Sequence, residues 1–427
     1  MYFNINTFGC KVNQYDGEVL KRLMTEAGFE ETFLAELADI FIINSCTVTE
    51  NGDKKALHEA ERIRRQKPSA VIVLTGCYPQ AFPKKAAEIT AADIITGTAD
   101  RTKIPEKIKA FLEERNRIVS LNANTACYEE TAIATETDKT RAFVKIEDGC
   151  DRFCSYCIIP YARGRVRSRL PEKIREEIAA QCEAGHREIV LVGINLSCYG
   201  KELGLTLADA VEIAAENPLV ERVRLSSLEP ELLTIEQIER LASVKKLCSH
   251  FHLSLQSGCD ETLRRMNRHY TSAEYAEIVQ NLRDVFPNCA ITTDIMVGFA
   301  GETEDEFKRS MTFAKEIGFA KIHVFTYSVR EGTAAAKRTD FIAPEIKNQR
   351  YKEMSALADE LRSNFLKSQI GTVQRVLVEK QTSPDYINGY TENYTPVRIY
   401  GGKAARHELV SVKITEATEN CCLGKQV

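Results

Sequence analysis

Three cysteines stand close together in the segment GCDRFCSYC at positions 149 to 157, where Cys150, Cys154 and Cys157 have the spacing C-x3-C-x2-C. A structural zinc or a closed iron–sulfur cluster takes four protein ligands, whereas a catalytic metal keeps one position open. Three thiolates in so short a loop can ligate three irons of a cubane cluster and leave the fourth iron free for a substrate or cofactor. A structural zinc completed by a distant histidine is the alternative.

A second set of cysteines is spread along the first part of the chain. Cys10, Cys46 and Cys77 each follow a short apolar run, in NINTFGC, IFIINSC and VIVLTGC. If these runs are parallel strands, their C-terminal ends share one edge of a sheet, and the three cysteines converge there. Any one of them alone fits a buried packing thiol. The three together favour a second iron–sulfur cluster.

The other cysteines match no pattern. The sequence has no run of about 18 apolar residues, so we expect no membrane span. It shows no secretory signal, so we expect the protein in the cytoplasm, where its fourteen cysteines stay reduced. The net charge of −4 gives no global attraction to nucleic acid, so an RNA partner requires a local basic patch. We interpret the following as structural or incidental thiols: Cys127, Cys182, Cys198, Cys248, Cys259, Cys289, Cys421 and Cys422.

The first cysteine set requires an α/β domain to position it. Residues 1–116 alternate short apolar runs such as DIFIIN with helical patterns such as KKALHEAERIRRQ, which predicts a doubly wound parallel α/β domain. Residues 117–140 are polar and rich in threonine and alanine, without sustained periodicity, and they predict a linker.

Two further domains are predicted beyond this linker. Residues 141–367 repeat a strand-then-helix pattern six times, which predicts a partial (β/α)6 barrel, because eight units close a full one. The C-x3-C-x2-C loop follows the first of these strands, where barrel enzymes place reactive groups. Residues 368–427 contain strand patterns separated by turn-rich stretches such as SPDYINGY, and they predict a small antiparallel β-barrel.

Several barrel strands end in polar residues or glycines. Side chains at the C-terminal mouth reach a ligand lying across the barrel, and glycine permits close backbone approach. For any single residue, a hydrogen bond to a neighbouring loop explains it equally well. As a set they predict a polar cofactor above the strands. The predicted contacts are Gly193, Asn195, Ser227, Glu229, Gln256, Asp294 and Gly298.

Two groups of residues are candidates for RNA binding. Four arginines alternate in ARGRVRSR and would share one side of an extended segment, either as a solvated face or as a phosphate-binding strip beside the active site. In the last domain, tyrosines are interleaved with basic residues, a composition suited to a single-stranded RNA loop, although acidic residues nearly balance the basic ones. The arginines are Arg163, Arg165, Arg167 and Arg169. The last domain contributes Tyr386, Tyr390, Tyr394, Tyr400, Arg375, Lys380, Arg398, Lys403 and Arg406, with Tyr390, Tyr394 and Arg398 as the main candidates.

The motif C-x3-C-x2-C with Tyr156 before its last cysteine, on a partial six-strand barrel, resembles the radical S-adenosylmethionine (SAM) enzymes. In that superfamily the amino and carboxylate groups of SAM chelate the open iron of a [4Fe–4S] cluster, and electron transfer yields methionine and a 5′-deoxyadenosyl radical. The resemblance implies that SAM is the polar ligand of the barrel mouth and that Tyr156 lies among its contacts.

Two three-cysteine sites followed by a small β-barrel resemble the methylthiotransferases over nearly the whole chain. In that family the first domain holds an auxiliary cluster, and the last is a TRAM domain that binds RNA. GCKVN around Cys10 is most similar to enzymes acting on threonylcarbamoyladenosine in tRNA, since relatives acting on isopentenyladenosine usually carry GCQMN and those acting on a ribosomal protein carry GCPKN. GFAGET and REGTAA lack prolines that the family often has, in loops and not at ligands.

The resemblance implies an enzyme that adds a methylthio group to C2 of N6-threonylcarbamoyladenosine (t6A) at position 37 of tRNA, using two [4Fe–4S] clusters and SAM. An aromatic C–H bond is too inert for acid–base catalysis, which explains the need for a radical. Lys11 and Asn13, beside Cys10, are candidate donors to the substrate carboxylate, and a structural role fits either residue at least as well.

The implied partners are the tRNA anticodon stem-loop and an electron donor such as flavodoxin or ferredoxin, and we expect a monomer. Two alternatives stay open. One is the same chemistry on isopentenyladenosine tRNA or on a ribosomal protein side chain. The other is an RNA-binding iron–sulfur protein that senses redox state without catalysis.

Overall fold

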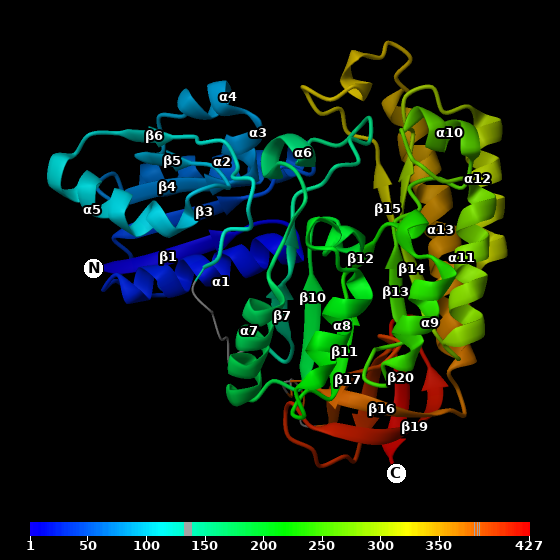
Figure 1. Cartoon of the computed structure of the whole chain (residues 1–427). Helices are drawn as coiled ribbons and strands as arrows, with labels where there is room; N and C mark the ends of the chain where they lie inside the picture. Colours follow the sequence, from blue (N-terminus) through cyan, green and yellow to red (C-terminus); the bar gives the residue numbers. More distant parts are fainter. Residues whose placement is uncertain (132–138, 380, 382, 384) are drawn as a thin grey trace.

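The computed structural model contains three domains, with the N-terminal domain beside a central barrel and the C-terminal barrel at one end of it (Figure 1). It describes residues 1–131, 139–379, 381, 383 and 385–427. The α/β domain, the partial barrel and the small closed barrel agree with the predicted fold class.

The N-terminal domain is built on a parallel sheet with the strand order β2-β1-β3-β4-β5-β6. The chain first places β2 on one side of β1 and then adds β3 and all later strands on the other side. The edge between β1 and β3 is therefore the topological switch point, where doubly wound folds bind ligands. The strands are β1 (Tyr2–Thr7), β2 (Glu30–Glu31), β3 (Ile40–Ser45), β4 (Val71–Gly76), β5 (Ile94–Thr96) and β6 (Ile118–Ser120).

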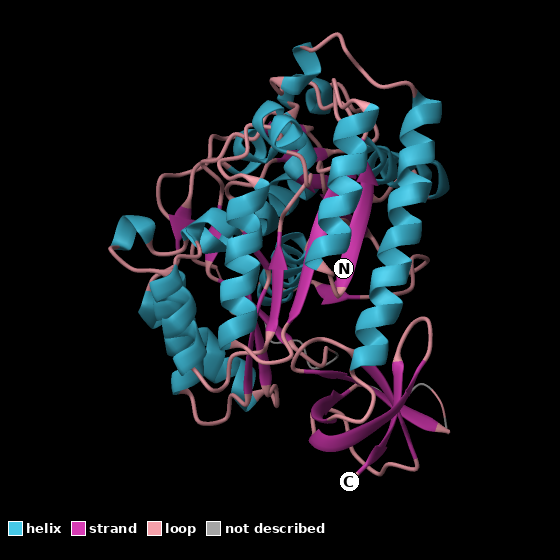
Figure 2. Cartoon of the chain, turned by 90° about the vertical axis from the view of Figure 1, so that its right-hand side faces the viewer, coloured by secondary structure: helices cyan, strands magenta, loops and turns pink. Residues whose placement is uncertain are grey.

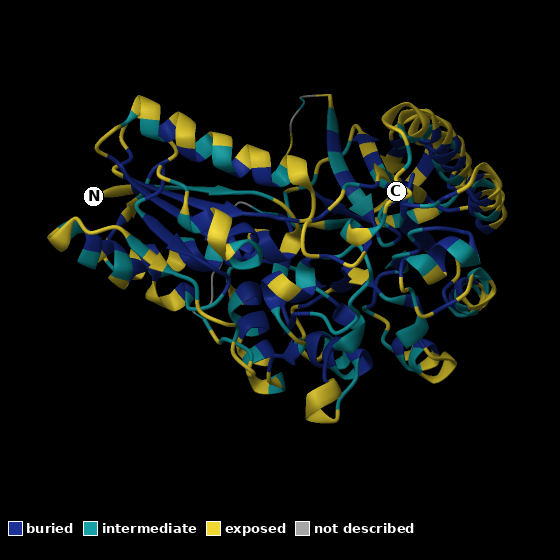
Figure 3. Ribbon diagram, turned by 90° about the horizontal axis from the view of Figure 1, so that it is seen from above, coloured by how far each residue is buried: buried dark blue, intermediate teal, exposed yellow. Residues whose placement is uncertain are grey.

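Helices cover both faces of this sheet. Apolar residues of α1 (Lys11–Glu26) and α5 (Ile104–Glu114) pack against one face, and those of α2 (Glu50–Gln66) pack against the other. Seen from above, the buried strands lie between helices whose outward faces are exposed (Figure 3). Burial on both sides explains why β3 and β4 are apolar runs without alternation.

The strand β6 corrects the expected start of the linker. Residues 118–120 pair with β5 as the last strand of the sheet, so the N-terminal domain extends beyond residue 116. Two apolar residues, Ile118 and Val119, are too short a run to predict a strand. Part of the expected linker, residues 132–138, lies outside the described residues.

The central domain is a parallel sheet of six strand positions, with the order β7-β10-β11 continued by β12-β13-β14-β15. Its strands are β7 (Ala142–Lys145), β10 (Glu188–Val192), β11 (Arg222–Leu225), β12 (Ser227–Leu228), β13 (His250–Leu253), β14 (Ala290–Val297) and β15 (Lys321–Thr326). Ser226 separates β11 from β12 within the third position. No pairing joins β7 to β15 in the described residues, so the barrel is open, as predicted.

Helices form the outer layer of the barrel (Figure 2). They are α7 (Pro171–Glu183), α8 (Leu207–Glu216), α9 (Ile235–Ser243), α11 (Ser272–Val285), α12 (Glu304–Ile317) and α13 (Pro344–Ser368). On the inner side, Val12 of α1 packs against Val190 and Val192 of β10. The N-terminal domain is thereby docked on the strands of the barrel.

The C-terminal domain is a closed barrel with the order β16-β17-β18-β20-β19. Its strands are β16 (Val373–Val378), β17 (Tyr386–Thr391), β18 (Pro396–Tyr400), β19 (Leu409–Ala417) and β20 (Cys422–Gln426). The pairs are antiparallel except β18 with β20, which is parallel and was not predicted. The stretch YINGY, which was expected within a turn, forms β17 instead. Gly389 allows two strands to approach closely here, because a Cβ at this position would lie 2.5 Å from the Leu377 carbonyl oxygen.

Across the described part of the chain, none of the helices combines the length and the apolar character that a membrane span requires.

Candidate cluster and cofactor site

The C-x3-C-x2-C loop is held in a fixed shape by its own backbone. It follows β8 (Glu147–Asp148), which pairs with β9 (Arg167–Ser168). Gly149 has φ +92°, and a Cβ there would lie 1.9 Å from the Arg165 carbonyl oxygen, so this position requires glycine. Within the loop, the Cys157 amide donates to the Cys154 carbonyl at 2.9 Å. The three cysteines are therefore presented together at the end of the first barrel strand.

Two side chains reach the sulfurs of this loop. Asn195 Nδ2 lies 3.7 Å from Cys150 Sγ, and Arg268 Nη1 donates to Cys154 Sγ at 3.3 Å. Arg268 is held in place by Glu229, whose Oε1 it contacts at 3.0 Å. Donors directed at sulfur are typical of the surroundings of thiolate-ligated iron.

Burial raises the pKa of all three thiols, that of Cys157 to about 12. Buried thiolates need a cation as compensation, which the irons of a cluster supply. Within the described residues, Asn195 Oδ1 and Glu147 Oε1 are buried without a hydrogen-bond partner. Unpaired buried acceptors next to Cys150 fit a polar ligand at this position. The donor set therefore fits a cluster with an open iron.

A cavity of about 1250 Å³ is lined by residues of all three domains, from Cys10 and Cys46 across the barrel strands to Tyr390 and Tyr394. Gly193, Ser227 and Asp294, which were predicted as cofactor contacts, line it. Asp294 Oδ2 also lies 3.3 Å from His252 Nε2. Ser226, which the sequence analysis did not select, lines the cavity as well and has a buried hydroxyl without a partner in the described part of the chain.

The other predicted contacts have different surroundings. The Tyr156 ring packs edge-on against Phe299 at 6.3 Å, and Glu229 is engaged by Arg268. Gln256 has φ +68° and bonds through its backbone to Asp294 and Met296. A Cβ at Gly298 would lie 2.3 Å from Lys347 Cγ, so a helix side chain packs against this glycine, and its contact with a cofactor stays a prediction.

Cys10, Cys46 and Cys77 lie at the C-terminal edge of the first sheet, after β1, β3 and β4. Cys10 and Cys46 line the large cavity, and a Cβ on Gly9 would be only 2.6 Å from Cys46 Sγ. Cys77 is buried and does not line the cavity. Burial raises the pKa of its thiol to about 11; the positive charge of Arg163 opposes this shift, and repulsion from Cys46 and Cys10 adds to it. The three thiols therefore share one electrostatic environment at the switch point.

No three His, Cys, Asp or Glu side chains of the described residues are close enough to chelate a single metal ion. The thiolates of a cubane each ligate a different iron, so they stand farther apart than the ligands of one ion.

Lys11 and Asn13 differ in what they face. Lys11 is exposed to the cavity that it lines, where partial desolvation together with repulsion from Arg224 and Arg141 lowers its pKa. Asn13 is buried, and its Nδ2 donates to the carbonyl oxygens of Phe8 at 2.7 Å and Ser45 at 2.9 Å. Of the two roles predicted for Asn13, the structure supports the structural one, because its amide fixes the loops that carry the cysteines.

The predicted strip of four arginines does not form. Arg163, Arg167 and Arg169 are buried, and only Arg165 is exposed, with Asp151 3.3 Å away. Arg163 pairs with Asp148 and Arg169 with Glu177, so these charges are neutralised inside the protein. The prediction failed because the segment is not one extended strand: Arg163 ends a helix, β9 spans only Arg167 and Ser168, and the buried arginines meet carboxylates of other elements.

Tyr390 and Tyr394 are half-buried and line the large cavity. Their rings stack at 4.7 Å, and Arg141 and Arg224 of the central barrel lie 4.9 Å from Tyr390 and 4.5 Å from Tyr394. The guanidinium groups that these two tyrosines attract belong to the same chain, and the role of the tyrosines in RNA binding stays a prediction. Arg398 is exposed and lies 4.9 Å over the Tyr386 ring. Lys380 lies outside the described residues.

Sequence reasoning missed three charged residues of the site. They are Glu147, Arg268 and Arg330. Arg330 donates to Thr47 at 2.6 Å and to Asp53 at 2.5 Å, next to Cys46. An acidic residue at the strand end directly before the cysteine loop was a usable signal for Glu147. Neither arginine stands in a segment whose pattern points to a cluster.

Three family models match the chain: the radical SAM superfamily over residues 144–314, an uncharacterized protein family, UPF0004, over residues 2–97, and the TRAM domain over residues 367–427. Threonylcarbamoyladenosine tRNA methylthiotransferase MtaB of Bacillus subtilis is 39% identical over 422 residues, which cover 96% of this chain and 93% of the relative. The chain belongs to the radical SAM methylthiotransferases. The predicted family, enzyme class and fold are thereby confirmed.

Further comparisons agree with this membership. A tRNA-2-methylthio-N(6)-dimethylallyladenosine synthase of Oceanobacillus iheyensis is 35% identical to this methylthiotransferase, over 97% of the chain and 82% of the relative. The radical SAM methyltransferase TsrM from Kitasatospora setae has a similar fold, with a TM-score of 0.58 and 13% identity over 76% of this chain and 72% of that one. As a radical SAM enzyme, this methylthiotransferase uses a [4Fe–4S] cluster and SAM.

Proposed function

We propose that this methylthiotransferase adds a methylthio group to C2 of N6-threonylcarbamoyladenosine at position 37 of tRNA, next to the anticodon. Relatives named for threonylcarbamoyladenosine come from Bacillus subtilis at 39% identity and Thermotoga maritima at 35%. Relatives named for dimethylallyladenosine reach 35%, so overall similarity alone does not separate the substrates. The observation that carries the proposal is the position of Lys11, beside Cys10 and in the cavity.

The chemistry of the two substituents explains the importance of Lys11. The threonylcarbamoyl group ends in a carboxylate, which an ammonium group in a confined cavity binds well, whereas an isoprenyl chain requires an apolar wall. Lys11 follows the cysteine that we assign to the auxiliary cluster, so a base presented there has its N6 substituent within reach of the lysine.

The proposal assigns one [4Fe–4S] cluster to Cys150, Cys154 and Cys157, and an auxiliary one to the set Cys10, Cys46 and Cys77. With SAM bound, the first cluster supplies the radical chemistry. Asn195 and Arg268 donate to the sulfurs of that cluster's ligands, and Glu229 orients Arg268. The cavity lined by Cys10, Cys46 and Gly193 lies between the first cysteine set and the strands of the barrel and is large enough for a nucleotide.

The substrate is tested with tRNAs that carry either modification. Reconstituted enzyme is incubated with each tRNA, and the nucleosides are analysed by mass spectrometry for the methylthio product. Turnover only on the isopentenyl form would overturn the assignment of t6A.

The role of Lys11 is tested separately with Lys11→Met, which keeps the length of the side chain and removes its charge. A charged hydrogen bond contributes about 1.5–3 kcal/mol, so KM for t6A tRNA is expected to rise roughly 10- to 100-fold. Lys54→Met, on the exposed side of α2, is the control. An unchanged KM would remove Lys11 from substrate recognition, and the assignment of t6A would then depend on the assay with the two tRNAs alone.

The anticodon stem-loop requires a surface that binds RNA, and the C-terminal barrel offers one. Tyr386, Tyr400, Lys425 and Lys413 are successive cross-strand partners on β17, β18, β20 and β19. Two aromatic rings beside two ammonium groups suit stacked bases and phosphates. Replacing both lysines by alanine is expected to reduce the slope of log affinity against log salt by roughly 1 to 2, whereas Lys308→Ala on α12 serves as control. An unchanged slope would remove this row from the tRNA interface.

The remaining partners are part of the same proposal. The enzyme acts as a monomer in the cytoplasm, and a small electron donor such as flavodoxin or ferredoxin reduces its radical cluster. Size-exclusion chromatography with light scattering tests the first statement, and SAM cleavage with each purified donor tests the last.

A further inference from the structure

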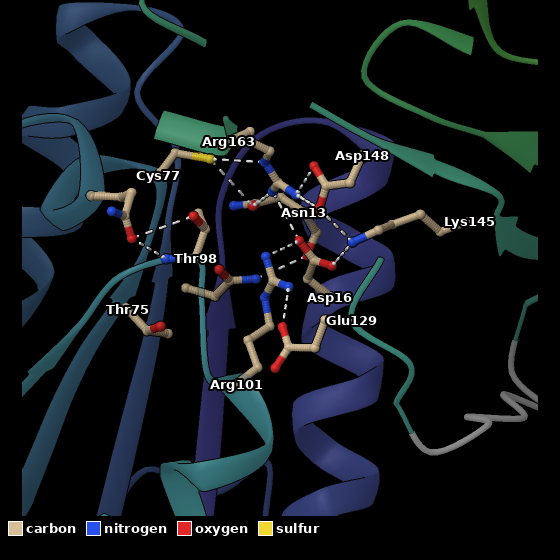
Figure 4. A network of polar contacts seen from close by, with 12 residues as sticks. Asn13, Asp16, Thr75, Cys77, Thr98, Arg101, Glu129, Lys145, Asp148 and Arg163 are labelled. Carbon is tan, nitrogen blue, oxygen red and sulfur yellow. Dashed lines mark hydrogen bonds and ion pairs between the residues drawn. The ribbon is translucent and has the colours of Figure 1, made fainter. Parts of the chain in front are cut away.

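A network of buried charges lies between the N-terminal domain and the central barrel (Figure 4). Asp16 of α1 contacts Arg101 at 3.1 Å, Lys145 at 2.9 Å and Arg163 at 2.9 Å. The network comprises the cations Arg101, Lys145, Arg163 and Arg167 and the carboxylates Asp16, Glu129 and Asp148. Among the described residues of this network, four cations face three carboxylates, so one positive charge is in excess beside the cysteines.

Arg163 is the member of this network that touches a cysteine sulfur. Its side chain is fully buried, and its Nε donates to Cys77 Sγ at 3.3 Å. Nη2 donates to Asn13 Oδ1 at 2.7 Å, and Nη1 contacts the two carboxylate oxygens of Asp148 at 3.3 and 3.2 Å. All three guanidinium nitrogens therefore have partners.

These partners belong to the supports of both cysteine sets. Asp148 ends β8, two residues before Cys150, and Arg163 itself ends α6 (Ile159–Arg163), which begins two residues after Cys157. On the other side, Asn13 binds the carbonyl oxygens of Phe8 and Ser45, which lie next to the Cys10 and Cys46 loops. The helix α3 (Cys77–Ala81) packs directly against α6.

We propose that Arg163 is a positioning residue for both cluster sites, which holds Cys77 by an N–H···S hydrogen bond and fixes the two cysteine-bearing regions against each other. The inference rests on the proposed function in one respect, namely the auxiliary cluster on the first cysteine set. A guanidinium group is suited to this role because its planar fork serves several acceptors at once, which a lysine ammonium does not reproduce.

The hydrogen bond has an electronic consequence in addition to its geometry. Donors to ligand sulfurs stabilise the more negative, reduced state of an iron–sulfur cluster and raise its reduction potential. The excess positive charge of the network acts in the same direction. Loss of Arg163 is therefore expected to lower the potential of the auxiliary cluster, an effect that a purely structural residue would not produce.

Arg163→Gln is the principal variant. It leaves three cations for three carboxylates, so the network stays balanced and the fold is expected to persist. Arg163→Lys keeps the charge without the fork and serves as the second variant. Arg175→Gln, on the exposed side of α7 with Glu216 as its partner, is the matched control.

Two measurements test the proposal. In protein whose Cys150, Cys154 and Cys157 are replaced by alanine, the remaining cluster is titrated by electron paramagnetic resonance, and Arg163→Gln is expected to shift its potential to a more negative value. In the full enzyme, the ratio of methylthio product to 5′-deoxyadenosine is expected to fall roughly 10- to 100-fold in both Arg163 variants. Both values should stay unchanged in Arg175→Gln.

The outcomes separate the two hypotheses. If the protein without the radical-site cysteines holds no iron, the auxiliary cluster itself is wrong, and the role of Arg163 at Cys77 fails with it. If that protein holds about four irons and Arg163→Gln changes neither the potential nor the product ratio, only the role of Arg163 is wrong. Folded Arg163 variants that lose iron selectively from the auxiliary site would support the positioning role.

Discussion

The carboxylate of Glu188 anchors the arginines that join the central barrel to the C-terminal barrel. It is fully buried at the start of β10 and accepts from Arg141 Nε at 2.8 Å and Arg224 Nε at 2.7 Å. Arg224 donates onward to the carbonyl oxygens of Thr391 at 3.2 Å and Glu392 at 2.9 Å. Removing the carboxylate should therefore loosen the contact between the two domains.

The electrostatics set the magnitude of this effect. Burial raises the pKa of Glu188, but Arg224, Arg141 and Arg222 outweigh it and lower the pKa from 4.5 to about 2. This difference corresponds to about 3 kcal/mol in favour of the folded state, similar to the roughly 3–5 kcal/mol lost when one partner of a buried ion pair is removed. Because the folded pKa is lowered, the stabilisation is present above pH 4.5 and disappears as the pH falls toward 2.

We expect Glu188→Gln to increase undocking of the C-terminal barrel at neutral pH. A cost of about 3 kcal/mol corresponds to roughly 100-fold faster hydrogen–deuterium exchange at the amides of residues 390–395 that docking protects. Mass spectrometry of peptides from this segment measures the change. Glu221→Gln is the matched control, because the pair of Glu221 with Arg375 lies on the half-exposed rim of the same interface and contributes about 0–1 kcal/mol.

The reasoning would be refuted by exchange of residues 390–395 that is unchanged in Glu188→Gln or no faster than in Glu221→Gln. A difference between wild type and Glu188→Gln that failed to shrink between pH 4.5 and pH 2 would contradict the assigned sign.

Three further changes test the cluster sites. Replacing Cys10, Cys46 and Cys77 together by alanine should leave about half of the iron and preserve SAM cleavage while abolishing the methylthio product, and loss of cleavage in folded protein would contradict the separation of roles. Gly149→Ala places a Cβ 1.9 Å from a carbonyl oxygen at φ +92°, so we expect strain of roughly 1–3 kcal/mol or more and loss of the radical cluster, measured as iron content; full iron loading would disprove the requirement for glycine. Arg268→Met should slow 5′-deoxyadenosine formation about 10- to 100-fold, since Cys154 loses a donor and Glu229 its partner, and a normal rate would exclude this role.

The convergence of Cys10, Cys46 and Cys77 could be predicted from the sequence because it depends on local signals. Each cysteine follows an apolar run, and parallel strands necessarily bring their C-terminal ends to one edge. The open barrel and its cysteine loop followed from the same periodicity. By contrast, β17 was missed because an asparagine followed by a glycine is typical of a turn. Glycine is nevertheless suited to this strand position, because a Cβ on Gly389 would collide with the carbonyl oxygen of Leu377 on the neighbouring strand.

The environment of the charged residues was decided only by the tertiary structure. Arg163 meets Asn13, 150 positions away in the sequence, and Arg224 meets the carbonyl oxygen of Thr391, 167 positions away. An alternating row of arginines has the same pattern whether it faces water, phosphate or buried carboxylates. Whether such a charge binds RNA or closes a domain interface depends on desolvation and on the nearest opposite charges, and both are set by which distant elements pack against it.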